Sequence, residues 1–127
     1  EGAAGMVETN VNIAAVTMNG DTITSCVIDA VQAQVSFDGQ GQILTDLSAP
    51  VLSKNDRGAD YGMGAISSIG REWNEQAAAF AAYVTGKTLD QVAGIAVDEA
   101  TKPAEADLAS SVTISIGGFQ ALLEKLR

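Results

Sequence analysis

The chain has 127 residues with a formal net charge of −9; 46% of its residues are apolar and only 5% are aromatic. This length fits one domain over residues 1–127, with a core built mainly from small aliphatic side chains. The surplus of acidic residues argues against nucleic acid as a partner. The absence of histidine, with a single cysteine, argues against metal sites and imidazole-based catalysis.

Two runs rich in Val, Ile and Thr open the chain at residues 7–18 and 22–31, and "NGD" separates them. Because Asn-Gly tolerates the positive φ angles of tight hairpin turns, this pattern predicts two antiparallel strands. A similar arrangement follows, in which "QAQVSF" and "QILTDL" flank "DGQG". We therefore expect an N-terminal antiparallel β-meander of three or four strands.

A long segment without helical or strand periodicity follows at residues 48–66, with one proline and three glycines among polar residues. Loops of this length are uncommon inside a compact domain and are often functional. The stretch "YGMG" within it therefore supplies candidate ligand contacts: Tyr61, Gly62, Met63 and Gly64.

The next segment is alanine-rich and has the periodicity of a helix. Its apolar residues recur at spacings of 4, 4, 3 and 4, at Ile69, Trp73, Ala77, Phe80 and Val84. This spacing places them on one face of an α-helix, and Gly86 is suited to end it. We expect the rings on this face to belong to the core.

Three shorter elements complete the chain. Thr88 and Gln91 have capping-box spacing, which predicts a short helix over residues 88–94. Residues 95–99 suggest a brief strand, and residues 101–109 a turn or short helix that starts near Pro103. The last apolar residues mark an amphipathic C-terminal helix: Phe119, Leu122, Leu123 and Leu126. The predicted fold class is α+β, with the β-meander packed against the alanine-rich and C-terminal helices.

The stretch "DLASSVTISIGG" at residues 107–118 allows two interpretations. In the structural one, Ser115 caps the last helix, Gly117 and Gly118 permit a tight entry, and residues 112–116 form a short buried strand. In the functional one, the same glycine-rich helix start offers free N–H groups to a phosphate.

Residues 107–113, "DLASSVT", resemble the flavin-attachment motif of the FMN-binding domains found in sodium-pumping quinone reductases and their ferredoxin-linked relatives. Asp107, Ser110 and Thr113 match that motif, whereas Ser111 stands where Gly is usual and Val112 where Ala is usual. Upstream, "ADYGMGAISSIGREW" and "YVTGKTLDQVAGI" resemble the family's Gly-rich loop and the segments after it. The likeness extends over nearly the whole chain and is greatest to small Gram-positive extracytoplasmic members.

The resemblance implies an electron-carrier domain rather than a stand-alone enzyme. FMN would be joined to Thr113 as a phosphoester by a flavin transferase, or held non-covalently, and a membrane or surface redox protein would exchange electrons with it. The location implied is extracytoplasmic, secreted or anchored through a segment outside this chain. The cofactor-binding residues implied are Tyr61, Gly62, Met63, Gly64, Asp107, Ser110, Ser111, Thr113, Ser115, Gly117 and Gly118.

An alternative is a flavin-free binding or structural module of the same fold, with residues 54–66 as its contact surface. The Gly-to-Ser and Ala-to-Val departures and the few aromatic residues favour this alternative. A hydrolase is disfavoured, because the sequence offers no nucleophile paired with a base.

Overall fold

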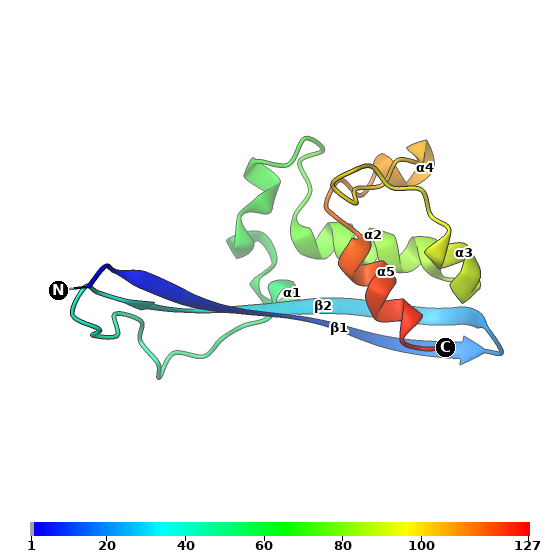
Figure 1. Ribbon diagram of the computed structural model, residues 1–127. Coiled ribbons are helices and arrows are strands. Elements are labelled where there is room, and N and C mark those ends of the chain that lie inside the picture. Colours follow the sequence, from blue (N-terminus) through cyan, green and yellow to red (C-terminus); the bar gives the residue numbers. More distant parts are fainter. Residues whose placement is uncertain (1) are drawn as a thin grey trace.

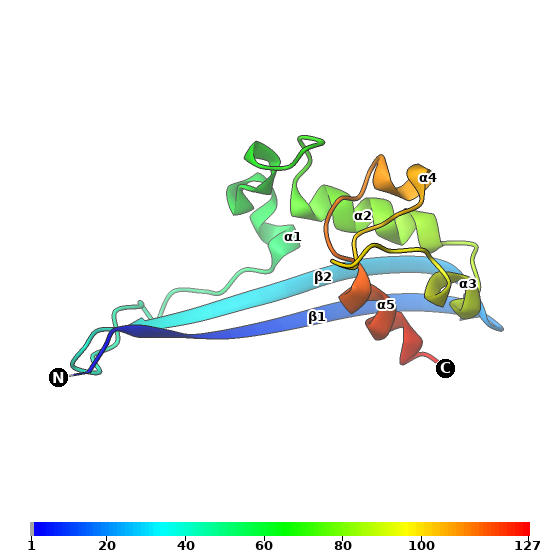
Figure 2. The same ribbon diagram turned by 45° about the horizontal axis from the view of Figure 1, so that its top comes forward.

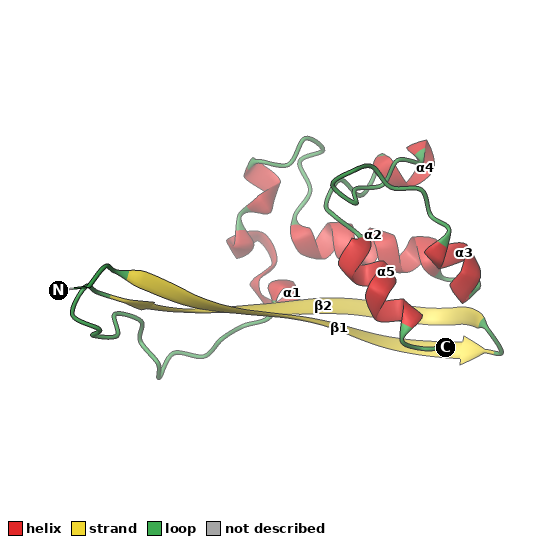
Figure 3. Ribbon diagram, in the orientation of Figure 1, coloured by secondary structure: helices red, strands yellow, loops and turns green. Residues whose placement is uncertain are grey.

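The computed structural model describes residues 2–127 and shows a long β-hairpin with helices packed on one face (Figure 1). The predicted α+β class is confirmed. Strands β1 (Gly5–Asn19) and β2 (Thr22–Phe37) form the hairpin, and the helices follow them in the chain (Figure 3). The α-helices are α1 (Lys54–Arg57), α2 (Trp73–Val84), α3 (Leu89–Ala93), α4 (Ala106–Ala109) and α5 (Gly117–Glu124).

The sheet of the described chain has two strands, where three or four were expected. The predicted first pair is confirmed, and Gly20 supplies the positive φ of 63° at their turn. Residues 32–37 continue β2 without a turn, because nothing between residues 31 and 32 breaks the extended backbone. Residues 42–47 contribute an isolated bridge, from Ile43 to Phe37, in place of a further strand.

Only one end of the hairpin contributes to the core. Ala14, Val16 and Met18 of β1 pack against the buried cluster, as do Ile23 and Ile28 of β2. Beyond them the two strands continue past the helices as an extended arm, which both views show (Figures 1 and 2).

Helix α2 packs against β2 and carries the expected apolar face. Trp73 and Phe80 are buried, as predicted, and both contact Phe119 of α5, at centroid distances of 6.0 and 5.3 Å. The helix begins at Trp73 rather than near Ile69, because Gly70 takes a positive φ of 67° that interrupts the helical backbone.

The region predicted as a loop, residues 48–66, contains α1 and two short 3₁₀ helices, η1 (Gly58–Tyr61) and η2 (Met63–Ala65). The capping box of Thr88 and Gln91 is confirmed at the start of α3. The strand expected over residues 95–99 is reduced to one bridge between Val97 and Pro103. Because Pro103 takes part in this bridge, it does not begin a helix.

Helix α5 forms as predicted, but Ser115 does not cap it. The N-cap position is Ile116, and the Ser115 hydroxyl instead hydrogen-bonds to Thr101. Within residues 2–127, no helix has the length and apolar character needed to cross a bilayer.

Candidate functional site

A buried glutamine, Gln76 of α2, joins three segments that are distant in sequence. Its Oε1 accepts hydrogen bonds from the backbone N–H groups of Thr113 and Ile114, at 2.8 and 3.3 Å. Its Nε2 donates to the Arg71 carbonyl at 3.1 Å and to the Ser67 hydroxyl at 3.4 Å. Because Gln76 is completely buried, these bonds replace water and fix the segments relative to one another.

Thr113 lies on the wall of a cavity of about 390 Å³. Its side chain is half-buried, and its hydroxyl donates to Gln76 Oε1 at 3.3 Å. A hydroxyl that donates its proton keeps two lone pairs, so the Thr113 oxygen can still accept. The residues around the cavity are Met63, Ile66, Ser67, Ser68, Gln76, Lys102, Thr113, Ile114 and Ser115.

Lys102 is the one ionisable side chain among these lining residues. A tight turn holds it there, in which the Asp98 carboxylate accepts from the N–H groups of Ala100 and Lys102 at 2.9 and 3.0 Å. Thr101 in this turn has a φ of 58°, which is strained for a β-branched residue. Its hydroxyl bonds to Ser115, so the turn is fixed to the segment that carries Thr113.

The cavity also has an apolar side. Ile66 at its rim is 85% exposed, the highest exposure among the large apolar residues of the described chain. A neighbouring cavity of about 300 Å³ shares Met63, Ile114 and Ser115 with the first and extends to Trp73 and Lys54. The Lys54 ammonium lies 5.1 Å from the centroid of the Trp73 ring.

The glycine-rich loop reaches this site through a carboxylate clamp. Both oxygens of Glu72 accept backbone hydrogen bonds, from Met63 at 3.0 Å and Gly64 at 2.9 Å. A Cβ atom at Gly64 would lie 2.3 Å from Glu72 Oε2, so a side chain at this position would displace the Glu72 carboxylate from the clamp. The clamp therefore positions Met63 between the two cavities.

The structure brings together only part of the predicted site. Thr113, Ser115 and Met63 line the Thr113 cavity, and Gly118 lines its neighbour. Tyr61 points elsewhere and donates to Gln32 at 3.2 Å, while Gly62 supplies a turn with a φ of 83°.

The first part of the predicted attachment motif also lies away from the cavity walls. Asp107 is exposed on α4, and the hydroxyls of Ser110 and Ser111 donate back to carbonyls of that helix. Gly117 packs against Thr101, where an added Cβ would lie 2.9 to 3.1 Å from the threonine side chain. These residues shape the segment around Thr113 without lining its cavity.

Several residues of the cavity were not predicted from the sequence: Ile66, Ser67, Ser68, Gln76 and Lys102. For Gln76 a signal was present, because it lies between Trp73 and Phe80 on the face that was expected to be wholly apolar. Lys102 gave no such signal, since the unusual backbone at Thr101 brings it to the site.

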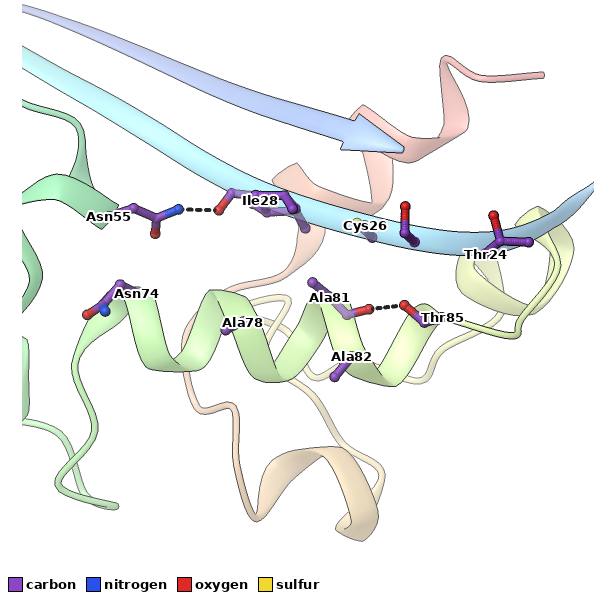
Figure 4. A pocket seen from close by; sticks show the side chains of 11 residues that line it. Thr24, Cys26, Ile28, Asn55, Asn74, Ala78, Ala81, Ala82 and Thr85 are labelled. Carbon is purple, nitrogen blue, oxygen red and sulfur yellow. Dashed lines mark hydrogen bonds between the residues drawn. The ribbon is translucent and has the colours of Figure 1, made fainter. Parts of the chain in front are cut away.

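A larger cavity, of about 510 Å³, lies between β2 and α2 (Figure 4). Five of its lining residues have polar side chains: Thr24, Ser25, Asn55, Asn74 and Thr85. Asn55 and Thr85 bond to the carbonyls of Ile28 and Ala81, whereas the buried Oδ1 of Asn74 has no hydrogen-bond partner among the described residues. Burial raises the pKa of the Cys26 thiol there, which favours the neutral thiol over the thiolate. None of the predicted site residues line this cavity.

Comparisons of the chain with protein-family models, with curated proteins and with solved structures found no match in any of the three.

Proposed function

We propose that this chain is an FMN-binding electron-transfer domain that works outside the cytoplasm, with FMN joined through its phosphate to the Thr113 oxygen. A flavin transferase would move FMN from an activated FMN donor to the Thr113 hydroxyl, so that the donor's phosphoanhydride bond breaks as the phosphoester bond forms, and the donor's leaving group departs with the hydroxyl proton. The redox partner of the domain would be a membrane or surface protein. The observation that supports this most directly is the place of Thr113, which lines one cavity together with Lys102 and the exposed Ile66.

The polar side of the cavity suits a phosphate. Lys102 provides a positive charge, and Ser67 and Ser68 provide hydroxyl donors. No carboxylate is among the lining residues, although the whole chain has 16 acidic residues against 7 basic ones. A cavity with this charge distribution favours an anion over a cation.

The apolar side suits a flat aromatic group. Ile66, Met63 and Ile114 offer apolar surface next to Thr113, and the neighbouring cavity extends that surface to Trp73. The first cavity alone is within the range of about 300–1,000 Å³ that is usual for small-molecule sites. When bound, FMN would supply one-electron or two-electron transfer.

The two departures from the attachment motif do not narrow the cavity. Val112 is completely buried in the core, so its branched side chain points away from the Thr113 hydroxyl. The Ser111 hydroxyl bonds to the Leu108 carbonyl at 3.3 Å. Both substitutions are therefore compatible with an accessible Thr113.

The test is the intact mass of the chain produced together with a flavin transferase. We expect one added FMN on the wild type, none on Thr113→Val, and full addition on the control Ser48→Ala, whose exposed hydroxyl lies outside both the motif and the cavity. An unmodified wild type would contradict the proposal, as would an FMN adduct that persists in Thr113→Val.

A further inference from the structure

The arm of the hairpin has its apolar side turned away from the helices. Side chains alternate across a strand, and the β1 residues that enter the core are even-numbered. The odd-numbered residues of both strands in the paired region from 7 to 35 therefore lie on the opposite face. We name this the outer face, and it contains the cross-strand pairs Val7–Val35, Thr9–Ala33, Val11–Val31, Ile13–Asp29 and Ala15–Val27.

The other face of the arm is polar and already satisfied. The Glu8 carboxylate accepts from the side-chain amides of Asn10, Gln32 and Gln34 at 2.6 to 2.9 Å. Water can cover that face without cost. The outer face differs, because Val7 and Val27 near its two ends remain 60% and 61% exposed.

Along β1 the outer face is apolar and exposed at Val7, Val11 and Ile13, whereas the odd-numbered β2 residues from 29 to 35 are half-buried. A row of exposed apolar side chains on a two-stranded ribbon indicates a surface that is covered in the working protein. Contiguous patches of several hundred Å² are uncommon on soluble monomers, and a two-stranded hairpin without a covered face is at best marginally stable. The arm nevertheless keeps unbroken pairing from Gly5 to Thr17. A partner on the outer face would account for both the apolar side chains and the length of the ribbon.

We infer that the outer face is an interface on which a second copy of this chain packs, sheet against sheet. Eight of the ten outer-face residues are apolar, and the one ionisable group among them, Asp29, already accepts from the Asn55 and Ala30 N–H groups. Two identical outer faces therefore bring together only one charged side chain from each copy, Asp29, even though each chain has a net charge of −9. A two-fold axis makes such a contact self-complementary.

The size of the face sets the strength of the contact. Five residue pairs at about 6.7 Å per pair, on strands about 4.8 Å apart, present at most roughly 500 Å² once side-chain width is included, because the odd-numbered β2 residues from 29 to 35 are half-buried. Two copies together would bury at most about 1,000 Å², which is near the lower limit for a specific interface. The dimer is therefore weak and concentration-dependent, and it does not depend on bound FMN.

The experiment is sedimentation or light scattering of the full chain from about 5 to about 500 µM, a range wide enough to detect a weak contact that depends on concentration. We expect the mass to rise toward that of two chains, and to rise further in high salt, because salt screens the repulsion between acidic chains while the contact itself is apolar. A mass of one chain over the whole range overturns the inference, including when that monomer binds lipid vesicles.

Two variants locate the contact. Val11→Glu, at the centre of the outer face, should leave a monomer at concentrations where the wild type is dimeric. Met6→Glu is the matched control, since Met6 lies on the same strand and the opposite face and is 51% exposed against 46% for Val11. If Val11→Glu loses the fold by circular dichroism, Val11→Thr, which keeps strand propensity, replaces it. A dimer that persists in the folded variant would place the contact elsewhere and overturn the inference.

Discussion

Gln76 is the residue on which the proposed site depends most. Its side-chain oxygen accepts hydrogen bonds from the backbone of the segment carrying Thr113, and its side-chain nitrogen donates to the segment that precedes α2. Its position is in the middle of an otherwise apolar helix face, where a buried polar group is tolerated only if its bonding groups are satisfied. One side chain therefore links the core to the cavity.

Replacement of Gln76 by methionine, which is similar in volume, should lower the free energy of unfolding by about 2–3 kcal/mol, because the N–H groups of Thr113 and Ile114 lose their acceptor. Urea denaturation measures this change. The control Gln40→Met, at an exposed position, should change stability by less than about 0.5 kcal/mol. Equal effects of the two substitutions would show that the bonds of Gln76 are not what holds the segment.

Glu8 gives the arm a dependence on pH. Its pKa is lowered from 4.5 to about 2, mainly by the hydrogen bond from Asn10 and then by those from Gln34 and Gln32. Because the pKa is lower in the folded chain, the carboxylate stabilises the fold above about pH 4.5 and loses that contribution as the pH falls toward 2.

Melting temperatures of the wild type and Glu8→Gln, measured from pH 7 to pH 2, test this. We expect the wild type to be the more stable at pH 7 and the difference to narrow below pH 4.5. The effect should be small, because Glu8 is exposed to solvent. A difference that stays constant down to pH 2 would exclude the carboxylate as its cause.

At the scale of elements, the start of α5 is defined by a close contact rather than by a side-chain cap. Gly117 lies against Thr101, the strained residue that precedes Lys102. Hydrogen bonds to the Asp98 carboxylate and the Ser115 hydroxyl stabilise that strained turn. The entry of α5 and the position of the cavity lysine are thus coupled.

Adjacent glycines of α5 allow a matched comparison. Gly117→Ala should destabilise the chain by about 1–2 kcal/mol, because the new Cβ overlaps Thr101. Gly118→Ala meets only the flexible end of Asn12, at 3.1 Å, and should be neutral or stabilising by up to about 1 kcal/mol through helix propensity. Thermal denaturation of both variants is the measurement, and the reverse order of stability would contradict the packing described for Thr101.

At the scale of the whole molecule, sequence patterns predicted the elements better than their assembly. Local periodicity, turn residues and capping predicted the hairpin and the helices α2, α3 and α5, because each of these signals lies within a few residues. The expected third and fourth strands failed because "DGQG" resembles a hairpin turn, whereas residues 42–47 form a single bridge to β2. Whether an extended segment pairs along its length with a neighbouring strand or at a single residue depends on tertiary contacts, which the local sequence does not determine.

The same division applies to the site. Thr113, Ser115 and Met63 were predicted and lie around one cavity. Lys102 reaches the cavity because Thr101 takes a positive φ, which the backbone preference of threonine opposes. Gln76 reaches it through a hydrogen bond between residues that are 37 positions apart in the sequence. Asp107 was predicted as a ligand residue because it matches the attachment motif, and that match did not reveal that α4 would turn it toward solvent.

The central claim, that Thr113 holds FMN, is tested most directly by flavin fluorescence of the chain in a denaturing gel after production with a flavin transferase. Denaturation removes any flavin held only by contacts, so the signal reports the covalent bond alone. If Thr113 holds FMN covalently, we expect a fluorescent wild-type band and a dark Thr113→Val band of equal protein content. A dark wild-type band, or a Thr113→Val band as bright as the wild type, would contradict it.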